Sequence, residues 1–242
     1  MVEDDPNDAE LAEREIRRAD IVATFRRVDT REAMSAALRE FAPDIILTDH
    51  SLPAFGAADA LELAQQLAPG TPVIVVTGRL GDESAVQYLQ AGAADYVVKD
   101  HLHRLSPAVL RALNVRQSRD AQARAYQLQA ATYRIAQVAM NAPGLDELLP
   151  TVHQIVGELM PAKNFYIALY DEAADLITFP YFIDEIDPAP APRAPSAGLT
   201  EHVLRTGRAL LSKPESESEL AALGVLFAVI AWVFYHGYPF RL

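Results

Sequence analysis

The chain has 242 residues, half of them hydrophobic, and a formal net charge of −12. This length allows one large domain or two small ones, and the negative charge disfavours non-specific binding to nucleic acid or anionic lipid. Cysteine is absent, which excludes disulfides, thiolate metal sites and thiol nucleophiles. The start, MVEDDPNDAE, lacks the basic and apolar segments of a secretory signal, so we expect a cytoplasmic protein.

Strand-like and helix-like stretches alternate in the first half of the chain. Helical patterns cover residues 8–19, 31–41, 57–67 and 82–91, and strand-like runs cover 21–28, 44–48, 73–77 and 95–98. Before them, only Met1 and Val2 remain of a first strand, so we expect its true start to lie upstream. Short apolar strands between helices predict an α/β fold, a doubly wound, five-stranded parallel sheet whose first strand is truncated.

The second half has a different pattern. Residues 105–140 predict one long helix, which ends at the Asn-Ala-Pro-Gly turn of 141–144. A helix over 145–159, strands over 163–170 and 177–183, and a helix over 198–206 follow. We therefore divide the chain into a first domain at 1–112, a linker helix at 113–142, a small α+β domain at 143–211 and an apolar tail at 212–242.

Polar side chains follow the predicted strands of the first domain. Glu3 and Asp4 follow the first strand, Asp49 follows DIILT, Thr77 closes VIVVT and Lys99 follows DYVV. In an open parallel sheet, ligands bind outside the carboxyl ends of the strands. Clustered carboxylates favour a hard cation such as Mg²⁺, and a lysine beside them suits phosphoryl transfer to Asp49 as the nucleophile.

Four motifs in this order resemble the receiver domains of two-component response regulators: VEDDPNDA at 2–9, ILTDHSLP at 46–53, VVTG at 75–78 and DYVVKD at 95–100. The resemblance implies a flavodoxin-like fold and a sensor histidine kinase as phosphodonor. It implies that Asp49 is the phosphoacceptor, and that Asp4 binds Mg²⁺ directly, Glu3 binds it through water, and the backbone carbonyl of Ser51 completes the metal site.

The resemblance also implies a switch. Thr77 would hydrogen-bond the phosphoryl group, Lys99 would pair with it, and Tyr96 would change rotamer when Thr77 moves. We interpret His50 as a solvated loop residue. Receivers usually carry a Lys-Pro pair at the end of the last strand, and this chain has Lys99-Asp100 instead, so the geometry of that loop is open.

Residues 141–211 resemble the start of a GAF domain, through KNFYIALYDEAADLITFPYFIDE at 163–185 and GLTEHVLRTGRALL at 198–211. This implies a sensor or dimerisation module whose ligand is unknown. The tail contains a 16-residue apolar run at 220–235, shorter than the roughly 20 residues that span a bilayer. We expect no membrane span, and we favour a frameshift or truncation product over a hydrophobic anchor.

The linker helix carries a heptad seam, with Ala121, Leu128 and Ile135 seven residues apart. Such a seam predicts either a parallel homodimer or a helix that packs on its own GAF-like domain. Overall we expect a response regulator that relays phosphorylation of Asp49 to its C-terminal region and is not itself an enzyme. The alternative is the N-terminal fragment of a longer hybrid histidine kinase or cyclase. No helix-turn-helix with a basic recognition helix follows the receiver, so we expect no nucleic-acid partner.

Overall fold

The computed structural model describes residues 1–50, 52, 55–78, 82–196, 198–208, 210–211 and 228–229. It divides into two compact units, Met1–Arg124 and Ala125–Leu242, and each is described by itself. Ser51 and most of the apolar run at 220–235 lie outside the described residues. Among the residues that are described, no helix is long and apolar enough to cross a membrane.

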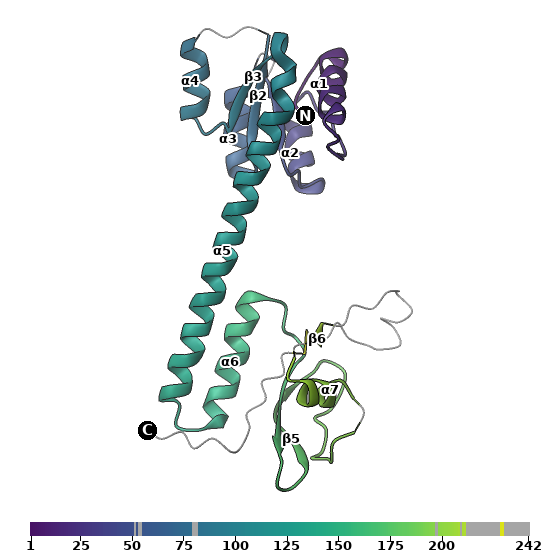
Figure 1. The fold of residues 1–242 in the computed structure, drawn as a ribbon. Helices are drawn as coiled ribbons and strands as arrows, with labels where there is room; N and C mark the ends of the chain where they lie inside the picture. Colours follow the sequence, from purple (N-terminus) through teal and green to yellow (C-terminus); the bar gives the residue numbers. More distant parts are fainter. Residues whose placement is uncertain are drawn as a thin grey trace. The chain divides into compact units, whose positions relative to one another are not determined.

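The first unit is an α/β sandwich in which helices flank a parallel sheet (Figure 1). The sheet has the order β1-β2-β3 with both pairs parallel. The elements of this unit, in chain order, are α1 (Pro6–Arg18), α2 (Arg31–Glu40), β1 (Ile46–Asp49), α3 (Ala57–Leu67), β2 (Val73–Thr77), α4 (Asp82–Gln90), β3 (Asp95–Val98), a 3₁₀ turn η1 (Lys99–Arg104) and the part of the long helix α5 (Leu105–Asn141) up to Arg124.

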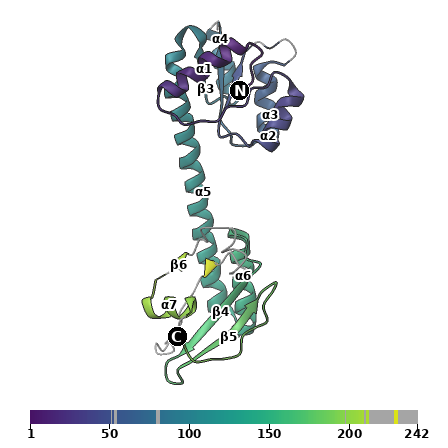
Figure 2. The same cartoon turned by 90° about the vertical axis from the view of Figure 1, so that its right-hand side faces the viewer.

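Alternation along the strands divides the core into two layers. Ile46, Val73 and Val75 point to one face of the sheet and pack with α2 and α3, which lie side by side (Figure 2). The intervening residues of the same strands, Leu47, Ile74 and Val76, point to the other face and pack with α1 and α5. Successive side chains of a strand point to opposite faces, so continuous apolar runs such as VIVVT are buried on both sides, as expected.

The predicted five strands are not all formed among the described residues. The run 21–28 has no strand apart from Val28, and Val22 is fully exposed. Val2 makes single parallel bridges to Val28 and to Thr48, so it occupies the place between the missing second strand and β1. The described backbone bonds from residues 1–3 to this run lie near its end: Val28 exchanges hydrogen bonds with Met1 and Glu3, and the carbonyl of Arg26 accepts from the N-terminal ammonium. A strand forms only where a neighbour offers partners for its backbone groups.

The second unit contains the elements that the sequence predicted. These are α6 (Leu145–Leu159), the antiparallel pair β4 (Phe165–Asp171) and β5 (Leu176–Ile183), and α7 (Leu199–Thr206). The structure adds a short antiparallel pair that the sequence did not predict, β6 (Leu210–Leu211) with β7 (Ala228–Val229). His153 of α6 stacks on Phe165 and bonds Tyr181, so this histidine belongs to the packing between α6 and the hairpin. The assignment of this unit as GAF-like stays a prediction.

In the second unit, some residues of the heptad seam of α5 are buried and others are exposed. Ala131 is buried, whereas Leu128 is 60% exposed. Arg134, which lies between Ala131 and Ile135, forms a bidentate ion pair with Glu158 of α6. Part of the helix therefore packs within its own chain, and the homodimer through the seam stays a prediction.

Candidate functional site

Three carboxylates meet at the carboxyl edge of the parallel sheet. Oxygens of Glu3, Asp4 and Asp49 all lie within 4.8 Å of one another. Glu3 and Asp49 are buried, and Asp4 is exposed. Glu3 and Asp4 follow Val2, whose backbone bonds those of Leu47 and Asp49, so main-chain pairing brings the two strand ends together. Carboxylate oxygens in this arrangement suit a hard divalent cation that is partly open to water.

Lys99 lies at the centre of this acidic group. Its ammonium donates to Glu3 Oε2 at 3.0 Å and to Asp8 Oδ2 at 2.6 Å, and it lies 3.0 Å from Asp49 Oδ1. The absence of proline after Lys99 does not displace it, since η1 begins at Lys99 and the side chain still reaches the carboxylates. The structure thus brings together four of the predicted site residues: Glu3, Asp4, Asp49 and Lys99.

Burial and charge shift the ionisation of this group in opposite ways. Burial raises the pKa of Glu3, although the hydrogen bond from Lys99 partly offsets the shift. Burial alone lowers the pKa of Lys99, but its bonds to Asp8, Asp49 and Glu3 outweigh this effect, so the pKa is raised overall. Lys99 is therefore a permanent cation at neutral pH, held among carboxylates that repel one another.

Thr77 lies on β2, the neighbour of the strand that carries Asp49, and Tyr96 lies on β3, one strand further along the sheet. The register pairs Asp49 with Val76, so Thr77 stands one residue beyond, at the end of β2, with its side chain 1% exposed. Tyr96 pairs with Val75 in the register and packs, half-buried, against the core layer of α2 and α3. Thr77 thus lies at the same edge of the sheet as Asp49, while Tyr96 packs against the same core layer as Tyr88 of α4.

Two acids of the N-terminal segment differ from each other in role. Asp5 is the N-cap of α1 and accepts from the backbone N–H of Asn7, so it serves the helix. Asp8, in the first turn of α1, bonds Lys99 and belongs to the acidic group. Sequence reasoning placed Asp8 only at the start of a helix. The signal available in the sequence was its place shortly after Glu3 and Asp4, in the first turn of the predicted helix.

His50 is half-buried and hydrogen-bonded, which corrects its interpretation as a solvated loop residue. Tyr88 Oη lies 2.7 Å from His50 Nδ1, and the two rings meet edge to face at 5.5 Å. The backbone N–H of His50 also donates to the carbonyl of Val76. The residue after Asp49 is therefore connected to α4 by a side-chain hydrogen bond, which sequence spacing could not indicate because 38 residues separate the partners.

Replacing Tyr88 by phenylalanine should remove this bond and keep the ring contact. We expect a loss of about 0.5–1.5 kcal/mol of unfolding free energy, the usual net value of one hydrogen bond. Urea unfolding followed by circular dichroism measures it. Tyr126→Phe is the control, because Tyr126 is 74% exposed on α5, and a surface change of this kind stays within about 0.5 kcal/mol. Equal stabilities of the two variants would contradict the role given to the Tyr88 hydroxyl.

The space beside Asp49 is small. A cavity of about 50 Å³ is lined by Glu3, Asp8, Asp49 and Lys99 together with apolar side chains of α1 and the sheet. Pockets that enclose organic ligands usually have about 300–1,000 Å³. The space beside Asp49 therefore has the size for an ion and not for an organic substrate.

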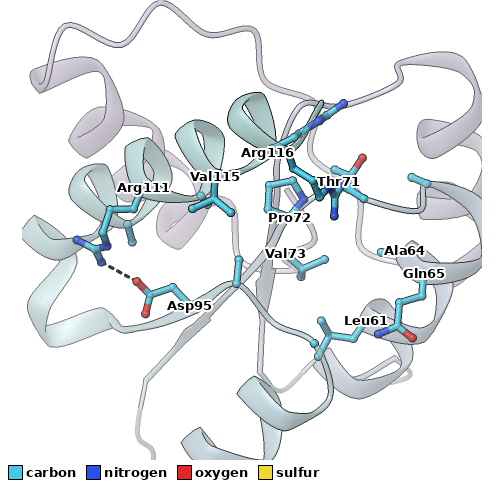
Figure 3. Close-up of a pocket in the computed structure, with 17 residues that line it drawn as sticks. Leu61, Ala64, Gln65, Thr71, Pro72, Val73, Asp95, Arg111, Val115 and Arg116 are labelled. Carbon is cyan, nitrogen blue, oxygen red and sulfur yellow. Dashed lines mark hydrogen bonds and ion pairs between the residues drawn. The ribbon is translucent and has the colours of Figure 1, made fainter. Parts of the chain in front are cut away.

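A larger cavity of about 490 Å³ lies at the opposite end of the strands, between α3, the start of β2 and α5 (Figure 3). Three arginines of α5 line it, and each has a partner. Arg111 bonds Asp95, Arg116 donates to the carbonyl of Asp44 and Arg119 donates to the carbonyl of Gly70. These bonds hold α5 against the base of the sheet, so the three arginines stabilise the packing of α5.

The first unit is similar to proteins of a known family. A family model described as the response regulator receiver domain matches residues 1–109. The response regulator protein PilR of Pseudomonas aeruginosa is 36% identical over 118 residues, which are 48% of this chain and 26% of PilR. The regulatory protein AtoC of Escherichia coli is 30% identical over 107 residues, 44% of this chain and 23% of AtoC. The chain thus spans about a quarter of the length of these relatives.

Among solved structures, a CheY-like response regulator receiver domain protein from Methanospirillum hungatei is 24% identical. The match covers 49% of this chain and 94% of that protein, with a TM-score of 0.44. The family match includes the strand ends that carry the acidic group, Thr77 and Lys99. Residues 1–109 are a response regulator receiver domain of the kind that serves two-component systems.

Proposed function

We propose that the chain is a response regulator whose receiver accepts a phosphoryl group on Asp49 from a sensor histidine kinase. The observation that carries the proposal is the position of Asp49, buried at the end of a parallel strand, 3.0 Å from the Lys99 ammonium and grouped with Glu3 and Asp4. A carboxylate in this place is an oxygen nucleophile with a fixed cation beside it. Positioning and charge stabilisation supply most of the catalysis in phosphoryl transfer.

Mg²⁺ fits the donor set at this edge of the sheet. Asp4 and Asp49 would hold the ion, Glu3 would bind it through water, and the carbonyl of Ser51 would complete the site. The ion would neutralise charge on the transferring group. The chain's own residues do the rest: Asp49 supplies the attacking oxygen, Lys99 holds negative charge, and Thr77 hydrogen-bonds the phosphoryl group.

The relay runs through Thr77 and Tyr96 and continues into the C-terminal region. Tyr96 packs against the layer that also receives Tyr88 of α4, so a change of the Tyr96 rotamer would alter the packing of α4. The second unit, as a GAF-like sensor, and α5, as a dimer seam, are the proposed recipients in a cytoplasmic protein. We expect no nucleic-acid partner.

Acetyl phosphate tests the phosphoacceptor directly. An Asp49 oxygen forms a bond to phosphorus while the bond from phosphorus to the acetate oxygen breaks, and acetate leaves with the electron pair. Intact-mass measurement after incubation with Mg²⁺ should show one added phosphoryl group on the wild type and none on Asp49→Asn. Asp20→Asn is the control, because this exposed residue has φ 57°, which asparagine tolerates. Labelling of Asp49→Asn at the wild-type level would refute the assignment.

A further inference from the structure

The Lys99 ammonium has three protons and three carboxylate neighbours. Its shortest contact is to Asp8 of α1 at 2.6 Å, whereas Glu3 and Asp49 both lie at 3.0 Å. The side chain of Asp8 is 33% exposed, more than the 6% of Glu3 and the 10% of Asp49. The carboxylate closest to the ammonium is therefore also the most exposed of the three, and it lies on α1.

Asp8 in the first turn of α1 stabilises this helix by itself, because a negative charge there interacts favourably with the helix dipole. That role needs no contact with Lys99, and Asp5 already caps the helix. The bond to Lys99 joins α1 to the turn after β3, 91 residues away in sequence. Of the three carboxylate contacts of the ammonium, this is the one made by α1.

A phosphoryl group on Asp49 competes for the same protons. An ammonium has three donors and no further capacity, so Lys99 must release or share a carboxylate to hold the new oxygens. Asp8 also adds a negative charge that repels an anionic phosphodonor, and at separations of a few ångströms this repulsion is sizeable even in a high dielectric.

We propose that Asp8 is a positioning residue that draws Lys99 toward α1 and thereby restrains phosphorylation of Asp49. The inference rests on the proposed phosphoacceptor function and adds a regulator to the same site. Asp8→Asn keeps the size and the helical position of the side chain and removes its charge. It should increase the second-order rate constant for phosphorylation by acetyl phosphate about three- to tenfold at low ionic strength, and less at high salt.

Asp5→Asn is the matched control. It removes the same charge three residues away, asparagine is an equally good N-cap, and the Asp5 side chain accepts only from Asn7 in the described contacts. Asp5→Asn should change the rate constant less than twofold. Asp8→Glu, which restores a carboxylate, should bring the rate constant back toward that of the wild type.

A second readout reports position without phosphorylation. The chain contains only three lysines, at 99, 163 and 213, so ¹⁵N spectra of the ammonium groups can be assigned with Lys163→Arg and Lys213→Arg. The Lys99 signal should move in Asp8→Asn and stay in place in Asp5→Asn. A purely helical role for Asp8 would leave that signal unchanged.

The possible results distinguish the phosphoacceptor role of Asp49 from the positioning role of Asp8. If the wild type takes no phosphoryl group on Asp49, the proposed function is wrong. If the wild type is labelled on Asp49 but Asp8→Asn reacts within twofold of it, the function stands and the role of Asp8 is refuted. Equal acceleration in Asp8→Asn and Asp5→Asn would also refute it, because the effect would then come from net charge alone.

Discussion

Lys99→Met is expected to lower the unfolding free energy of the receiver by about 2–4 kcal/mol at pH 7 without Mg²⁺. Removing one partner of a buried ion pair usually costs about 3–5 kcal/mol, because it leaves uncompensated charge. The side chain of Lys99 is 20% exposed, so water reduces the cost. The acidic group would keep four carboxylates, those of Glu3, Asp4, Asp8 and Asp49, and lose the cation among them. Urea unfolding of both proteins measures the difference.

The pH dependence of this loss follows from the direction of the pKa shifts. The pKa of Lys99 is raised in the folded protein, so its stabilising contribution is complete below the ordinary value of 10.5 and is lost as the pH rises through the folded pKa. The pKa of Glu3 is raised above 4.5, so ionisation of Glu3 destabilises the fold as the pH rises through that range. The difference between wild type and Lys99→Met should therefore shrink as the pH falls toward 4.5.

Arg26→Met is the control for Lys99→Met. Arg26 pairs with Glu40 at 3.1 Å on the surface of the same unit, with side chains 40% and 65% exposed. Exposed pairs contribute about 0–1 kcal/mol, and this variant also removes one positive charge. A Lys99→Met loss no larger than that of Arg26→Met at pH 7 would show that the acidic group does not depend on its lysine.

Mg²⁺ at one hundred times its dissociation constant is expected to stabilise the receiver by about 2.7 kcal/mol, the linkage value for one site on the folded state alone. Each kcal/mol moves the melting temperature of a domain of this size by about 4–8 °C. The ion also removes repulsion between Glu3, Asp4 and Asp49, whose oxygens lie within 4.8 Å of one another. Thermal melts over a series of Mg²⁺ concentrations measure the increment.

Asp4→Asn and Asp5→Asn form the matched pair for the metal site. At a fixed Mg²⁺ concentration the increment should largely disappear in Asp4→Asn and persist in Asp5→Asn, each measured against its own metal-free melt. The reason is that Asp4 belongs to the group of oxygens, whereas Asp5 accepts from Asn7 at the start of α1. Equal increments in the two variants would mean that Glu3 and Asp4 are not the acids that bind the metal and that the assignment is out of register.

The strand ends could be located from the sequence because local pattern and topology agree there. The runs ILTD and VIVVT are apolar until their last residues, and parallel strands deliver those last residues to one edge of the sheet. This reasoning reached Glu3, Asp4, Asp49, Thr77 and Lys99. It overestimated the strand at 21–28, since a strand forms only where a neighbour offers backbone partners, and the described backbone bonds from residues 1–3 to this run reach only Arg26 and Val28 near its end.

By itself, the sequence determined the α/β class, the order of the elements and the acids at the strand ends, because each depends on periodicity within a few residues. The tertiary structure decided which side chains meet. Asp8 bonds Lys99 across 91 residues, and Tyr88 bonds His50 across 38. Such pairs depend on how α1 and α4 lie against the sheet, and helix placement follows from the packing of many side chains that no local pattern specifies.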